Sequence, residues 1–118
     1  ASRCEEPPLS DYYKHDHLAG FAGIAEGQPE LGRKFFDYYN AVFAPGALSA
    51  REKALIALAV AHTVQCPYCI DAWTADSLAR GSDLEQMTEA VHVAVAIRGG
   101  ASLVHGMQML EQAKKAGM

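Results

Sequence analysis

Cysteine is scarce in this chain of 118 residues, and long apolar runs and basic stripes are absent. The longest apolar stretch, residues 54–64, is well short of the roughly 20 residues that cross a bilayer. The net charge is -4, and no clustered Lys and Arg residues offer to neutralise phosphates. Neither a membrane nor a nucleic acid is therefore expected as a partner.

The N-terminal segment also lacks the features of a secretory signal. Residues 1–9 carry both charge signs and two prolines but no hydrophobic centre, so they predict a flexible arm and a cytoplasmic protein. Hydrophobic residues make up 50% of the chain and charged residues 20%, which is the balance of a packed globular protein. The length suits one domain, which we place at residues 10–118.

No strand pattern or internal repeat competes with helical spacing, so the expected fold class is all-α. The spacing and the turn residues predict about six helices, at residues 10–24, 29–44, 50–64, 66–80, 82–98 and 102–115. The last two are separated at Gly99-Gly100, which predicts a break or a close helix contact. Residues 50–64 are apolar on nearly every side and should be covered by neighbouring helices or subunits.

Local signals mark where several of these helices begin. Pro29 and Pro67 fit the first turn of a helix, where a missing N–H costs nothing. Ser49 and Glu52 form a capping-box pattern, and a second such pattern is read at 82–85 after a stop at Gly81. The aromatic face of residues 29–44 is interpreted as core rather than as a cofactor site.

The strongest chemical signal is the C-x-x-C motif formed by Cys66 and Cys69. Their spacing places both sulfurs on one helix face, within range of a disulfide or of a shared metal ion. A helix that begins after Cys66 also favours thiolate over thiol, because its unpaired donors and positive end lie beside the sulfurs. The third cysteine, Cys4, is interpreted as an incidental thiol of the arm.

His62 is the predicted proton-transfer partner of this pair. It precedes Cys66 by four residues and Cys69 by seven, so an unbroken helix would align the three side chains and a kinked one would still keep them close. Glu52 is a weaker catalytic candidate, since its capping role explains it and a straight helix puts it about 15 Å from His62 along the axis. No role is assigned to the remaining histidines. Arg98 is interpreted as an ion-pair or helix-cap residue in preference to a ligand for an anion. Those histidines are His15, His17, His92 and His105.

The motif supplies what a thiol peroxidase needs: an attacking thiolate, an acid and a second thiol that closes a disulfide. Zinc held by the two cysteines with His62, and with His92 or His105, is an alternative. A general disulfide oxidoreductase is another, although the motif does not follow a strand as in thioredoxin-like folds.

The run from Leu48 to His62, followed by residues 65–72, resembles the AhpD-like branch of the carboxymuconolactone decarboxylase superfamily. The resemblance continues through 89–92 and 97–106, so it covers most of residues 45–110. Within that superfamily the chain is most similar to small peroxidase-like proteins associated with arsenosugar biosynthesis. This likeness suggests capture of trivalent arsenic by the soft dithiolate as a further alternative. The decarboxylase branch does not need a C-x-x-C and is set aside.

The resemblance implies an all-helical trimer or hexamer that reduces organic hydroperoxides through a Cys66–Cys69 disulfide cycle. It implies no cofactor, only an external thiol, dithiol or reducing protein as electron donor. It also implies a relay of glutamate, histidine and cysteine, with Cys69 attacking first, whereas the helix-end argument favours Cys66. In the family a histidine follows the second cysteine by four residues, and that position is Trp73 here. The position at which the family spacing expects the glutamate is Ala54.

Overall fold

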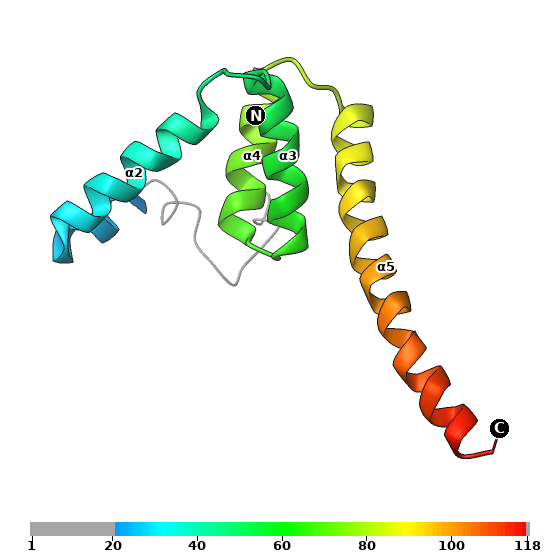
Figure 1. The fold of residues 1–118 in the computed structure, drawn as a ribbon. Helices are drawn as coiled ribbons and strands as arrows, with labels where there is room; N and C mark the ends of the chain where they lie inside the picture. Colours follow the sequence, from blue (N-terminus) through cyan, green and yellow to red (C-terminus); the bar gives the residue numbers. More distant parts are fainter. Residues whose placement is uncertain (1–20, 118) are drawn as a thin grey trace, which may run out of the picture.

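The computed structural model of the protein describes residues 21–117, and every element in that range is a helix (Figure 1). A 3-10 helix, η2 (Phe21–Gly27), leads into α2 (Pro29–Phe43), α3 (Ala50–Thr63), α4 (Pro67–Ala79) and α5 (Leu84–Lys115). The all-α prediction is therefore confirmed. The predicted arm at 1–9 and residues 10–20 of the helix predicted at 10–24 lie outside the described residues, and residues 21–24 belong to η2.

Two antiparallel neighbours, α3 and α4, form the centre of the molecule. The predicted capping box is present at the start of α3, where the Ser49 hydroxyl accepts from Glu52 N and Glu52 Oε1 accepts from Ser49 N. Pro67 occupies the first turn of α4, and Cys66 is its N-cap, as predicted. Between the helices Gln65 adopts a left-handed backbone with φ of 57°, which reverses the chain direction within a few residues.

The helix α5 differs from the prediction in two ways. Residues 84–115 form one helix of 32 residues, so Gly99-Gly100 does not break it, and a Cβ at either glycine would meet nothing within 4 Å among the described residues. Each glycine costs roughly 1 kcal/mol of helix stability, which a long helix capped at its start tolerates. The cap is Asp83 with Gln86, one residue later than predicted. The expectation of about six helices was therefore wrong for this half of the chain.

The buried core is small and lies where α3 meets its neighbours. Ala54, Leu58 and Ala61 of α3 pack with Met87 and Ala94 of α5 as the buried hydrophobic residues of the described chain. This confirms that α3 is central. The radius of gyration is 19.3 Å, against roughly 13–14 Å for a compact chain of this length. The excess comes from α2 and the C-terminal half of α5, which extend away from the α3–α4 pair (Figure 1).

The apolar faces of these two extended helices are exposed in the single chain. None of the residues of α2 is buried, and Leu31 and Tyr38 are 62% and 68% exposed. On α5, Leu103 is 81% exposed and Met107 68%. The interpretation of the α2 aromatic face as core is thus wrong for one chain alone. Among the described helices, none is long and apolar enough to cross a membrane.

Candidate active site

The two cysteines of the motif lie together at the start of α4. Cys66 caps the helix and Cys69 sits one turn into it, so their Sγ atoms are 2.6 Å apart. The Cys69 backbone N–H also donates to Cys66 Sγ at 3.3 Å. Both thiols are free and half-buried. The predicted juxtaposition of two sulfurs at a helix start is therefore present.

The surroundings treat the two sulfurs differently. Burial, followed by the hydrogen bond to Cys66 and by the charge of that residue, raises the pKa of Cys69 to about 11. The Cys69 backbone N–H donates to Cys66 Sγ, and a thiol–thiol hydrogen bond joins the two sulfurs. At neutral pH the raised pKa keeps the Cys69 thiol protonated beside Cys66.

An apolar groove of about 520 Å³ opens beside Cys69. Its floor is one face of α3, and its walls come from α2 and from α4. Three aromatic rings form the wall nearest the thiol: Phe43 and Trp73 have ring centroids 4.3 Å apart, and Tyr39 lies 4.9 Å from Phe43. Apart from Lys53 and the Tyr39 hydroxyl, the groove therefore presents one thiol to an apolar surface. The lining residues are Tyr39, Val42, Phe43, Leu48, Lys53, Ile56, Ala57, Val60, Ala61, Val64, Cys69 and Trp73.

Tyr39 is part of this site and was not identified from the sequence. Burial raises the pKa of its phenol, a hydrogen bond with Trp73 lowers it, and the charges of Cys69, Asp76 and Cys66 raise it further. Its hydroxyl group therefore stays protonated beside the dithiol. No local pattern connects Tyr39 with Cys69, because the contact depends on how α2 approaches α4. Trp73 did carry a signal, since it follows Cys69 by four residues and so shares its helix face.

His62 lies on a different side of α3 from the groove. Its Nδ1 is 2.8 Å from the Leu58 carbonyl oxygen, and its ring lines a second hollow of about 490 Å³ between α3 and α5. Among the described residues no hydrogen bond joins it to either sulfur. The alignment expected from sequence assumes a continuous helix, whereas α3 ends at Thr63 and the chain turns before Pro67. A catalytic role for His62 stays a prediction.

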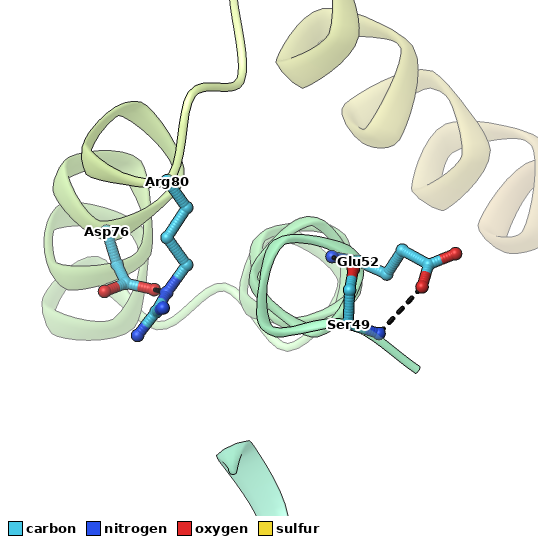
Figure 2. Close-up of polar contacts among 4 residues, drawn as sticks. All are labelled: Ser49, Glu52, Asp76 and Arg80. Atoms are coloured by element: carbon cyan, nitrogen blue, oxygen red, sulfur yellow. Dashed lines mark hydrogen bonds and ion pairs between the residues drawn. The ribbon is translucent and has the colours of Figure 1, made fainter. Parts of the chain in front are cut away.

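Glu52 is occupied at the opposite end of α3. Figure 2 shows its carboxylate turned back onto the Ser49 backbone, 2.8 Å from the nitrogen. Hydrogen bonds from the Ser49 backbone and side chain lower its pKa, and the side chain is fully exposed. The same view shows Asp76 and Arg80 paired along α4 at 2.8 Å, on exposed side chains. The structure does not bring Glu52 to His62, so its part in a relay also stays a prediction.

None of the remaining candidates within residues 21–117 is hydrogen-bonded to the dithiol. Arg98 donates to the Thr63 carbonyl and thereby ties α5 to the last turn of α3, which matches the cap interpretation. His92 and His105 lie exposed on α5, and Cys4, His15 and His17 lie outside the described residues. Within residues 21–117 no group of three or more His, Cys, Asp or Glu side chains could hold a metal ion. The structure thus brings no third ligand from that range to the two thiols.

Residues 29–112 match the model of the carboxymuconolactone decarboxylase family. A protein of Paracoccus denitrificans, "Uncharacterized protein 4 in cox locus", is 43% identical over 76 residues, which are 64% of this chain and 68% of that protein. A crystal structure from Methanobacterium thermoautotrophicum superposes with a TM-score of 0.70 at 30% identity, over 73% of this chain and 97% of the other.

Two further solved structures carry the family's description. The apo form of a carboxymuconolactone decarboxylase family protein from Legionella pneumophila has a TM-score of 0.64 at 29% identity, over 86% of this chain and 95% of the other. A Thermotoga maritima member, whose description suggests involvement in an antioxidative response, has a TM-score of 0.51 at 25% identity, over 72% and 94%. With most of its helices inside the matched range, the chain belongs to the carboxymuconolactone decarboxylase family.

Proposed function

We propose that this protein is a thiol peroxidase that reduces organic hydroperoxides through a Cys66–Cys69 dithiol–disulfide cycle. The observation that carries the proposal is a pair of free thiols 2.6 Å apart, of which Cys69 lines an apolar groove. A hydroperoxide with an apolar body would bind in such a groove with its peroxide group beside the sulfurs. The antioxidative description of the Thermotoga relative supports the same chemistry.

In the first step the Cys66 thiolate attacks the terminal oxygen of the hydroperoxide. An S–O bond forms, the O–O bond breaks, and its electron pair leaves on the alkoxide. The nearest proton belongs to the Cys69 thiol, which keeps it because its pKa is raised to about 11. Transfer of that proton releases the alcohol and leaves a Cys66 sulfenic acid beside a Cys69 thiolate.

In the second step the Cys69 thiolate attacks the sulfenic sulfur. The S–S bond forms, and the hydroxide that leaves takes a proton from solvent to become water. The peroxide has then been reduced by two electrons and the dithiol oxidised by two. An external thiol, dithiol or reducing protein restores both thiols by exchange, which a reducing compartment such as the cytoplasm supports.

The exposed apolar faces favour a homo-oligomer as the working form. The α2 face and the second half of α5 leave large side chains in water, including Leu103 at 81% and Met107 at 68% exposed. Monomeric proteins rarely expose contiguous apolar surface on that scale. Assembly into trimers or hexamers would cover it, and sedimentation velocity would measure the assembly directly.

The peroxidase proposal is tested by following cumene hydroperoxide consumption with dithiothreitol as reductant. Cys66→Ser and Cys69→Ser should each lower the rate by about 100-fold or more, because each removes one half of the cycle. Cys4→Ser, the third cysteine of the chain, is the matched control and should keep the rate. Normal turnover by Cys69→Ser would exclude the two-cysteine cycle.

The order of attack needs its own measurement. A dimedone probe should label Cys66 in the Cys69→Ser variant after one equivalent of peroxide, since Cys66 caps the positive end of α4. Labelling of Cys69 in the Cys66→Ser variant, with none of Cys66 in the other, would reverse the two roles. Peptide mass spectrometry locates the adduct in both variants.

A further inference from the structure

The apolar groove beside Cys69 runs along the length of α3. Its α3 residues recur at helical spacing, so they form one continuous stripe on that face of the helix. The stripe consists of Lys53, Ile56, Ala57, Val60, Ala61 and Val64. Cys66 N donates to Ala61 O at 3.1 Å, so the dithiol lies at the C-terminal end of the stripe and Lys53 at the other.

Lys53 is the one charged side chain among the described residues that line the groove. Its ammonium donates to the carbonyl oxygens of Val42 at 2.7 Å and Ala44 at 2.6 Å, at the end of α2. An ammonium has three donors, so one remains after these two bonds. Within residues 21–117 the ion pairs are Arg33–Glu30, Arg80–Asp76 and Lys115–Glu111, and none of them uses Lys53. The two carbonyls hold the cation in place without neutralising it.

We infer that the groove selects hydroperoxides that carry a carboxylate at the end of an apolar chain. The carboxylate would accept from Lys53, the chain would lie on Ile56, Ala57 and Val60, and the peroxide group would reach the dithiol. Lys53 and Ala61 are eight residues apart, or about 12 Å along the α3 axis, which suits an acyl chain of medium length. This inference rests on the proposed peroxidase function, and it makes Lys53 a specificity residue for that activity.

Binding can be measured without any turnover, because Trp73 is the sole tryptophan of the chain and lines the groove. Titration with dodecanoate, below its micelle concentration, should change Trp73 fluorescence and give an affinity about tenfold higher than that for dodecan-1-ol. Lys53→Gln should lower the dodecanoate affinity to that of the alcohol, whereas Lys53→Arg should keep the preference. Lys114→Gln, at the far end of α5, is the matched control.

Binding of dodecan-1-ol shows whether Lys53→Gln has lost only the cation or also the fold of the groove. A folded Lys53→Gln should bind dodecan-1-ol as the wild type does. Equal affinity of the wild type for both probes, or no response to either because a second copy or another chain segment covers the groove, would overturn the inference. If Lys53→Gln no longer binds dodecan-1-ol but Lys53→Arg keeps the full preference for dodecanoate, the inference is still supported. The wild type and Lys53→Arg then have in common a cation at position 53.

Turnover separates this inference from the proposed function. With a carboxylated hydroperoxide, Lys53→Gln should raise KM about tenfold and leave kcat in place, and the methyl ester should show no such change. Peroxidase activity with equal KM for the carboxylated hydroperoxide and its methyl ester would overturn only the proposed selectivity. Carboxylate binding by a protein that reduces no hydroperoxide overturns the peroxidase proposal and leaves the binding site standing.

Discussion

Phe43 of α2 packs on Trp73 of α4 with ring centroids 4.3 Å apart, and this contact joins an otherwise exposed helix to the site. Phe43→Ala should lower the free energy of unfolding by about 1–2 kcal/mol, because a half-buried ring and an aromatic pair are lost. Urea unfolding followed by circular dichroism measures the change. Phe35→Ala, on the same helix but 47% exposed, is the control and should cost less. Equal losses would show that Phe43 has no special part in holding α2.

The raised pKa of Cys69 predicts how stability depends on pH. Because burial and Cys66 raise the folded-state pKa to about 11, the folded protein holds the proton more tightly than the unfolded chain does. The resulting stabilisation is complete below the unfolded pKa and is lost as pH rises through the folded value. Tyr39, whose pKa burial also raises, acts in the same direction.

Urea unfolding at pH 8 and pH 10.5 tests this dependence. The wild type should lose stability between the two pH values, and Cys69→Ser should lose less of it because the contribution of the Cys69 thiol is then absent while that of Tyr39 remains. The Cys4→Ser variant should follow the wild type. A Cys69→Ser protein with the full wild-type dependence would show that the thiol is not its source.

Arg98 predicts a link between α3 and α5. Its guanidinium donates to the Thr63 carbonyl at the end of α3, so Arg98→Met removes a charge-assisted hydrogen bond and should cost about 1–2 kcal/mol. Arg80→Met removes only an exposed pair with Asp76, which contributes about 0–1 kcal/mol. Thermal unfolding ranks the two variants. A larger loss in Arg80→Met would contradict the assignment.

Ser77 offers a prediction of the opposite sign. It is fully buried in α4, and its hydroxyl finds no hydrogen-bond partner among the described residues. Ser77→Ala removes a buried polar atom at little change in volume, so it should raise the free energy of unfolding by about 1 kcal/mol. Ser49→Ala is the contrasting variant, since it removes a working helix cap and should cost about 1 kcal/mol. Destabilisation by Ser77→Ala would mean that its hydroxyl is satisfied in solution.

Local signals predicted much of the fold because they act within a few residues. The Ser49–Glu52 box and Pro67 each satisfy or remove backbone donors at one helix end, so their effect is independent of the rest of the chain. The helix break predicted at Gly99-Gly100 was wrong, because a glycine pair only weakens a helix and the residues on both sides continue it. The Asp83 cap was missed by one residue because Ser82 is also a good capping residue.

In the candidate site, too, local spacing could be predicted from the sequence and the packing of helices could not. The Cys66–Cys69 pair depends on spacing within one turn, and the sequence was sufficient to place it. Tyr39 and Lys53 reach the groove through the packing of α2 on α3, which no short pattern encodes. His62 stays a prediction: α3 ends at Thr63 and the left-handed backbone of Gln65 interrupts the helix, and among the described residues no hydrogen bond joins His62 to either sulfur.

The small buried core limits how far a single copy of the chain can stabilise its own fold. Leu58 and four small or flexible residues bury little apolar surface, while ordering each residue costs about 1–2 kcal/mol of conformational entropy. Any contact between copies that covers α5 would then contribute to folding by mass action, so the melting temperature would rise with protein concentration. Under the proposed assembly, dilution would therefore lower the stability of the fold.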